Sequence, residues 1–333
     1  MAMVTLDLTL AMTSNPRTDP VLSGAIQPEG VQFRSTTAAA SDIFWRQLSA
    51  QEFDVSEMSL SSLLIVIARN NRDWVGLPIF SQRHFFQTWA WVRTDAGVQR
   101  PSDLKGKRIG VPEYQQTAAL WSRAILEHDF GVKPSDMEWY MERTAERSHA
   151  AVTGFQPPNG VRFQYMAADQ TIGSMMMNGE LDATVMYHGR PTLVDRSRIS
   201  FEGNAKVRPL FADASAEAQR YFGKTGIFPI NHGMVVRRSL YEQHPWLPLN
   251  IFNAFRQAKE RVAIEMRQRA ETHLELGFLP PDAPSALRTD LYPYGVKSNR
   301  KTLETLAEYS LEQGLTPRQV ELEEVFAPST LDL

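Results

Sequence analysis

Residues 101–130 constrain the fold more than any other stretch, because PSDLKGKRIGVPEYQQTAALWSRAILEHDF describes a buried strand, a loop and a helix in succession. The apolar run at 109–111 has the length of a buried strand, and Pro112 ends it. The helix that follows carries Trp121 and Ile125 on one face. Such strand, loop and helix units are the building blocks of α/β folds.

The loop at residues 113–117 is a candidate anion site. Free backbone N–H groups at a helix start, together with the helix dipole, attract small anions. Gln116 and Thr117 add side-chain donors at this position. The alternative is an ordinary capped helix start that binds no ligand.

Strands and helices alternate along all 333 residues, a length that suits two domains. Strands are expected at 4–8, 31–34, 54–58, 109–111, 137–141, 161–166, 183–187 and 234–236. Helices are expected at 41–50, 63–68, 171–177, 248–276, 300–313 and after the capping-box pattern that begins at Thr316, with a loop at 15–24 and a mobile flap at 143–158. This order predicts an α/β fold with two lobes, each a mostly parallel sheet flanked by helices, and a cleft between the lobes.

Composition removes several classes of function. A net charge of -3, with no basic block among aromatic residues, indicates no nucleic-acid partner. No run of about eighteen apolar residues occurs, so no membrane span is expected. The N-terminal residues lack the pattern of a signal peptide, which predicts a cytoplasmic location. The sequence contains no cysteine, which excludes disulfides, a thiolate nucleophile and cysteine-ligated metal centres.

Three further positions carry candidate site residues. Ser59 and Ser61 open the helix at 63–68 and either cap it or donate to a ligand. Arg83 and His84 stand side by side, where Arg suits a carboxylate and His exchanges protons near neutral pH, unless they form a surface ion pair.

The end of the strand at 183–187 is the third of these positions. His188 and Arg190 follow it, at the edge where open α/β sheets bind ligands. We therefore count both residues as candidate ligand contacts.

Several motifs together resemble a known family. SDLKGKRIGV at 102–111 and GELDATV at 179–185 resemble one lobe of the type II periplasmic-binding-protein fold. More specific are EMSLSS at 57–62, RHF at 83–85, GVPEYQQTAALW at 110–121, FPINH at 228–232 and YPYGVKSNRKTLETL at 292–306, which resemble 4,5-dihydroxyphthalate decarboxylases. The similarity extends over nearly the whole chain.

This resemblance implies a cytoplasmic enzyme of aromatic-acid breakdown that converts 4,5-dihydroxyphthalate into protocatechuate and carbon dioxide. It also implies one lobe at residues 1–92 plus 234–333 and a second lobe at 93–233. The chain would cross between the lobes near 89–93 and 234–237. Both hydroxyl-bearing helix starts would then face one cleft.

The implied chemistry needs an acid and a base. Direct loss of carbon dioxide from an aromatic carbon would leave an aryl anion, so a proton must reach that carbon first or in step. We expect His84 and His232 to serve as acid and base, in an order left open, unless either is a core histidine. Arg83 is expected to hold the retained carboxylate, assisted by Gln116 and Thr117, with Ser59, Ser61, His188 and Arg190 as further binding residues.

No cofactor is expected, since the chain has no GxGxxG fingerprint, no Schiff-base lysine setting and no HExxH spacing. A metal site of histidines and carboxylates from distant positions stays open. The competing function is a solute-binding protein for a small organic acid, because the same fold binds without catalysis. Residues 86–88, FQT, depart from the family pattern and leave a different hydroxylated aromatic acid as a third possibility. Exposed aromatics among the seven tryptophans would suit a homo-oligomer.

Overall fold

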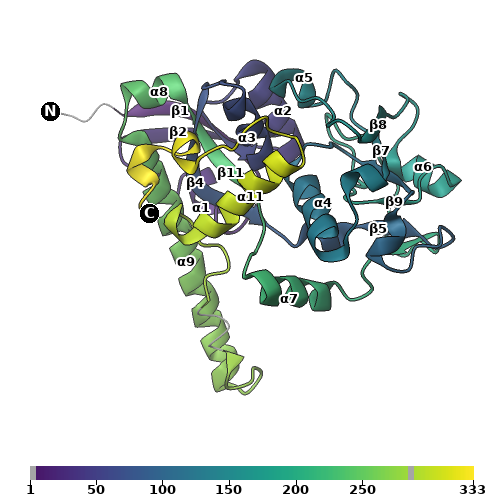
Figure 1. The fold of residues 1–333 in the computed structure, drawn as a ribbon. Coiled ribbons are helices and arrows are strands. Elements are labelled where there is room, and N and C mark those ends of the chain that lie inside the picture. Colours follow the sequence, from purple (N-terminus) through teal and green to yellow (C-terminus); the bar gives the residue numbers. More distant parts are fainter. Residues whose placement is uncertain (1–4, 284–288) are drawn as a thin grey trace.

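Within residues 5–283 and 289–333, which this computed structural model describes, the chain forms two mixed β-sheets with helices packed around them (Figure 1). Val4, which the first predicted strand included, lies outside the described residues. The observed order of strands and helices confirms the predicted α/β class with two sheets.

Sheet 1 has the strand order β2 (Val31–Thr37), β1 (Leu6–Met12), β3 (Val55–Ser59), β11 (Ile230–Arg237) and β4 (Trp74–Arg83). β1 pairs in parallel with β2 and β3, whereas β11 runs antiparallel to β3 and β4. The register sets His232 between Ser59 of β3 and Gln82 of β4. The end of β3 and the beginning of β11 therefore lie together at one edge of the sheet.

Sheet 2 has the order β10 (Val207–Pro209), β5 (Trp91–Arg93), β9 (Ala183–Thr184), β6 (Arg108–Val111), β7 (Glu138–Met141) and β8 (Arg162–Tyr165). β6 is parallel to β7 and β9, β7 is parallel to β8, and β5 is antiparallel to β9 and β10. Each sheet is therefore mostly parallel, as predicted, and has one reversed strand among the described residues.

The chain passes between the sheets twice in the described part of the structure. The first passage leads from β4 to β5 through the 3₁₀ turn η1 (Phe86–Trp89), and the second leads from β10 to β11 through α7 (Ala214–Thr225). The lobe boundaries that we expect from the sequence, 1–92 plus 234–333 against 93–233, remain a prediction.

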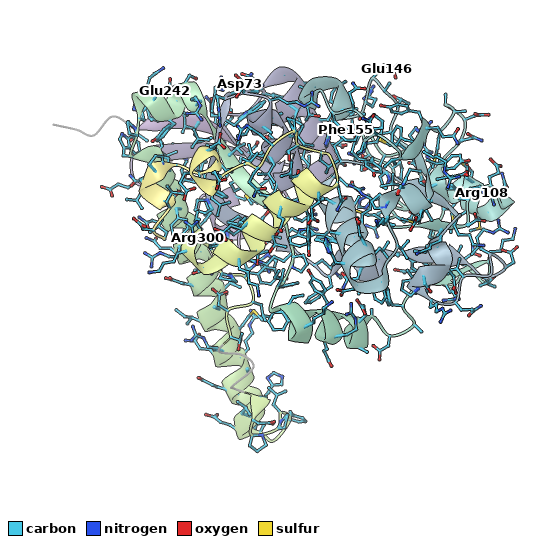
Figure 2. All side chains as sticks on the ribbon, in the orientation of Figure 1. Asp73, Arg108, Glu146, Phe155, Glu242 and Arg300 are labelled. Atoms are coloured by element: carbon cyan, nitrogen blue, oxygen red, sulfur yellow. The ribbon has the colours of Figure 1, made fainter. Side chains whose placement is uncertain are left out.

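The remaining helices cover the two sheets. They are α1 (Asp19–Leu22), α2 (Ala40–Ala50), α3 (Leu60–Ala68), α4 (Thr117–Phe130), α5 (Ala150–Thr153), α6 (Ile172–Asn178), α8 (Arg238–Gln243), α9 (Leu247–Glu275), α11 (Arg300–Glu312) and α12 (Leu322–Val325). Figure 1 shows the second half of α9 projecting away from the rest of the molecule. In Figure 2, Glu242 of α8 and Arg108 of β6 label opposite ends of the molecule. Across the described residues, no helix has both the length and the apolar character that crossing a membrane requires.

The stretch at 101–130 folds as predicted, and its helix joins the two sheets. Strand β6 and helix α4 follow the predicted order, and Gly131 closes α4 in the left-handed conformation at φ 65°. The buried indole of Trp121 donates its N–H to the carbonyl oxygen of Ile230 in β11, at 2.9 Å. α4 therefore binds directly to a strand of the other sheet.

Three local predictions need correction. The predicted loop at 15–24 contains α1, with a proline in its first turn, where the missing N–H costs nothing. The short helix predicted after Thr316 is present but begins later, at Leu322 of α12, because residues 314–316 close α11 and the N–H of Thr316 donates to the carbonyl of Ser310. Residues 143–158 do not form a separate polar flap, because Arg143, Ser148 and His149 are buried.

Candidate active site

A cavity of about 470 Å³ lies between elements of the two sheets. Residues on the side of sheet 1 that line it include Thr13, Ser41, Phe44, Ser59, Gln82, Asn231 and His232. Residues on the side of sheet 2 include Gln116, Thr117, Arg143, His149, Met186, His188, Arg190 and Asp195, and Trp89 of η1 completes the wall. Its volume suits a small organic molecule.

Two helix starts meet at this cavity, as the sequence predicts. The hydroxyl groups of Ser59 and Thr117 lie 2.9 Å apart, and the backbone N–H of Ser61 donates to Thr117 Oγ1 at 3.0 Å. The Ser61 hydroxyl donates to the carbonyl of Gln115, and Ser61 is not among the described lining residues. Ser59, Gln116 and Thr117 reach the cavity, whereas Ser61 joins the two helix starts behind it.

His232 is held against the cavity by a buried carboxylate that sequence analysis did not single out. Its Nδ1 lies 2.8 Å from Glu57 Oε1, and the ring packs edge-on against Phe44 at 4.7 Å between centroids. Glu57 comes from the middle of β3 and is fully buried. Because Nδ1 faces Glu57, Nε2 is the nitrogen left for the cavity, an arrangement suited to proton transfer.

Glu57 is satisfied by donors from three parts of sheet 1. The backbone N–H and the hydroxyl of Thr13 both donate to Oε2 at 2.7 Å, and the Ser81 hydroxyl donates to Oε1. Burial by itself raises the pKa of Glu57, but the hydrogen bond and charge of His232 and the bonds from Ser81 and Thr13 bring it below its ordinary value. Glu57 is therefore an anion that orients His232 and stabilises positive charge on its ring.

Arg83 lies outside the cavity, at the end of β4. Its guanidinium donates to the carbonyls of Phe228 and Pro293 at 3.1 and 2.9 Å, and to the side-chain oxygen of Asn299. Burial lowers the pKa of Arg83 to about 10. The guanidinium is engaged by oxygens of Phe228, Pro293 and Asn299, and the geometry does not support the predicted contact with a substrate carboxylate.

His84 is also absent from the described residues of the cavity wall. Its Nε2 accepts the indole N–H of Trp89 at 2.9 Å, and its Nδ1 is buried. Burial lowers the pKa of His84 below its ordinary value. A proton donor to the substrate must reach the cavity, so the geometry supports His232 and not His84 in that role.

His188 and Arg190 both line the cavity, although β9 ends at Thr184 and the strand predicted at 183–187 is shorter in the structure. Burial lowers the pKa of His188 below its ordinary value, and the attraction of Asp195 offsets only part of this effect. His188 is therefore neutral at pH 7 and able to accept a proton. Arg190 is exposed and has no carboxylate partner within residues 5–283 and 289–333.

A buried ion cluster on the side of sheet 2 escaped the sequence reasoning. Arg143 pairs with Asp195 at 2.7 Å and with Glu113 at 3.4 Å. Burial opposes its charge, but the two carboxylates raise the pKa of Arg143 above its ordinary value. Burial and the charge of Arg143 lower the pKa of His149 to about 3, so His149 stays neutral. These residues are far apart in the sequence and carry no shared motif, so no local signal identifies them.

The histidines and carboxylates do not assemble into a metal site in the part of the chain that the structure describes. No group of three or more histidine, aspartate or glutamate side chains there is arranged to hold a metal ion. The cavity wall offers instead His232 paired with a carboxylate, the two neutral histidines His149 and His188, and Arg190, which has no carboxylate partner in the described part of the chain.

Two sheets joined by two passages, with a ligand-sized cavity between them, define a protein of the periplasmic-binding-protein-like fold class. The alkanesulfonate-binding protein SsuA from Xanthomonas axonopodis pv. citri, bound to MOPS, is similar in structure, with a TM-score of 0.56, 13% sequence identity and 97% of each chain covered. The periplasmic aliphatic sulphonate-binding protein SsuA from Escherichia coli gives a TM-score of 0.53 at 14% identity, covering 98% of this chain and 99% of that one. Residues 21–154 match the family model described as ABC transporter, phosphonate, periplasmic substrate-binding protein.

Proteins related in sequence indicate a more specific family than the fold class does. It is 31% identical over 330 residues to the 4,5-dihydroxyphthalate decarboxylase of Comamonas testosteroni, covering 98% of both chains. It is also 31% identical over 217 residues to the enzyme of that name from Pseudomonas putida, covering 65% of this chain and 81% of the relative. The chain belongs to the 4,5-dihydroxyphthalate decarboxylase family.

Proposed function

We propose that this chain is a carboxy-lyase that removes carbon dioxide from a hydroxylated aromatic dicarboxylic acid, with 4,5-dihydroxyphthalate as substrate and protocatechuate as product. Membership of a decarboxylase family supports the reaction class. The observation that carries the proposal is the pair of His232 and Glu57 on the wall of the cavity.

In this reaction, His232 donates a proton to the ring carbon that carries the departing carboxylate. Glu57 stabilises the imidazolium ring and fixes its orientation, so that Nε2 carries the proton. Protonation of the ring carbon converts the ring into a dienone-like intermediate, from which carbon dioxide leaves without forming an aryl anion. Phe44 and Met186 give part of the cavity an apolar wall, which favours the departure of a neutral molecule.

His188 acts as the base that takes the proton from the hydroxyl group para to the departing carboxylate. Because burial keeps its ring neutral, His188 is available to accept a proton while His232 donates one. The different surroundings of the two histidines thus separate their roles.

The retained carboxylate is assigned to Arg190 and to the helix start at Gln116 and Thr117. Arg190 provides a guanidinium at the cavity that has no carboxylate partner among the described residues, and the first N–H groups of α4 provide donors at the positive end of the helix dipole. This pair of contacts replaces the role that the sequence suggested for Arg83.

Replacing Arg190 by glutamine is expected to raise KM about tenfold while leaving kcat nearly unchanged. A charge-assisted hydrogen bond to the retained carboxylate contributes equally to substrate and transition state, so its loss weakens binding uniformly. Steady-state kinetics with 4,5-dihydroxyphthalate measure both constants. Arg198→Gln, which removes an exposed arginine outside the described cavity wall, is the matched control. An unchanged KM in Arg190→Gln would exclude this contact.

The pH dependence of kcat/KM tests His188. Because burial lowers its pKa, the ring is protonated only below pH 6.5, and activity is expected to fall on the acid side of that value. His188→Asn is expected to lower kcat by about 10²-fold and to remove this acid limb. His273→Asn, on the exposed part of α9, should keep the wild-type profile. An acid limb that persists unchanged in His188→Asn contradicts the assignment.

The alternative function is a solute-binding protein for a small organic acid, which the structural similarity to SsuA favours. Incubation of the purified chain with 4,5-dihydroxyphthalate separates the two functions. Release of carbon dioxide and protocatechuate supports the decarboxylase. Calorimetric binding without product formation supports the solute-binding protein, and turnover of only another hydroxylated aromatic acid would change the substrate but not the reaction.

A further inference from the structure

Trp89 forms an aromatic part of the cavity wall, at the passage between the two sheets. It is the last residue of η1 and is partly exposed toward the cavity. Its indole N–H donates to His84 Nε2 at 2.9 Å, with 4.4 Å between the two ring centroids. This part of the cavity wall is therefore held in place by a histidine that does not itself reach the cavity.

The direction of this hydrogen bond fixes the state of His84. An indole nitrogen can only donate, so His84 Nε2 must present its lone pair, and the neutral ring carries its proton on Nδ1. That Nδ1 is buried and lacks a well-aligned hydrogen-bond partner among the described residues, while the backbone of the adjacent Phe85 also interacts with the ring. The bond to Trp89 is thus the one well-aligned hydrogen bond of the His84 ring within that part of the chain.

The indole is also held from a second side. Phe86 is fully buried and meets Trp89 edge-on, with ring centroids 5.3 Å apart. Its neighbour Gln87 is buried and donates to Glu217 of α7, which anchors η1 to that helix. The hydrogen bond and the edge contact together allow one orientation of the indole plane.

We propose that His84 is a positioning residue, which holds the Trp89 indole as a flat wall that selects planar aromatic dicarboxylates over saturated ones. The idea rests on the proposed function for the kind of ligand, but it concerns binding and not the reaction. A planar ring can stack on the indole face in an offset or edge-on arrangement, and such pairs add to the burial of apolar area. A saturated ring of the same size presents no π face.

The test compares two unreactive ligands, benzene-1,2-dicarboxylate and cis-cyclohexane-1,2-dicarboxylate, by calorimetric titration of the full chain. The wild type is expected to prefer the aromatic ligand about threefold to tenfold. Trp89→Leu should lose this preference, and His84→Leu should lose most of it. His84→Gln should retain most of it, since the amide oxygen can accept the indole N–H.

A double-mutant cycle shows whether His84 acts through Trp89. In the Trp89→Leu background, His84→Leu is expected to have no further effect on the preference. An equal loss in both backgrounds would overturn the positioning role, because a merely structural histidine acts independently of the indole. If His84→Leu fails to fold, the comparison of His84→Gln with wild type decides, because a lost preference there contradicts the proposal.

The outcome is separate from that of the proposed function, because neither ligand carries a hydroxyl group or reacts. A wild type that produces protocatechuate but shows no preference between the ligands would overturn the inference and leave the function standing. A clear preference without any turnover of 4,5-dihydroxyphthalate would support the aromatic wall and overturn the decarboxylase.

Discussion

Replacing His232 by glutamine is expected to lower kcat for 4,5-dihydroxyphthalate by about 10²- to 10⁴-fold, with KM changed by no more than about threefold. Glutamine has similar size but cannot carry a proton to the ring carbon, so the chemical step loses its acid while the binding contacts stay. Steady-state kinetics and calorimetric binding of benzene-1,2-dicarboxylate measure the two effects separately.

The matched control is His128→Gln, which changes an exposed histidine paired with Glu312 at the surface. It should have wild-type kinetics. Turnover of His232→Gln within about twofold of the wild type would remove His232 from the reaction.

Replacing Glu57 is expected to have two large effects. Glu57→Gln removes the negative charge that stabilises a positively charged His232 ring. It also places an amide N–H where the wild-type carboxylate accepts hydrogen bonds from Thr13, Ser81 or His232. We therefore expect kcat to fall about 10²-fold or more. Glu57→Ala leaves the donors of Thr13, Ser81 and His232 without their acceptor. Its free energy of unfolding should fall by about 3–5 kcal/mol.

The stability effect of Glu57 should depend on pH. Because its folded pKa lies below the ordinary value of 4.5, the ionised carboxylate stabilises the fold at neutral pH, and this contribution is lost as the pH falls through the folded pKa. Urea denaturation at pH 7 and at successively lower pH measures the difference between wild type and Glu57→Ala. The difference should shrink on the acid side, and a difference that grows there would contradict the ionised state of Glu57.

The sequence predicts those parts of the fold that local patterns control. The strand and helix at 101–130 follow from an apolar run, a proline and a terminal glycine, and the structure confirms each. The pattern at Thr316 predicts a helix start in error, because the same residues close α11 through hydrogen bonds to Ser310. A capping pattern is local, and tertiary packing decides which of two uses it serves.

Fewer of the site's contacts can be predicted from local sequence patterns. His188, Arg190 and Gln116 follow from their places after strands and at a helix start, where α/β folds gather ligand contacts. The pairing of Glu57 with His232 joins residues 175 positions apart, and no local pattern links them. For Arg83 the sequence predicted a substrate contact in error, because only the folded chain brings the oxygens of Phe228, Pro293 and Asn299 to its guanidinium.

The donors around Glu57 limit which positions of this site can be substituted independently. Thr13, Ser81 and His232 come from separate strands of one sheet or from the turn after a strand, and each satisfies the same buried charge. The loss of any one of them leaves a buried donor or acceptor unpaired, so substitutions at these positions are expected to be coupled. Arg190 at the exposed rim carries no such constraint. New substrate preferences should therefore arise through substitutions at exposed positions such as Arg190, while Glu57 and its donors are retained together.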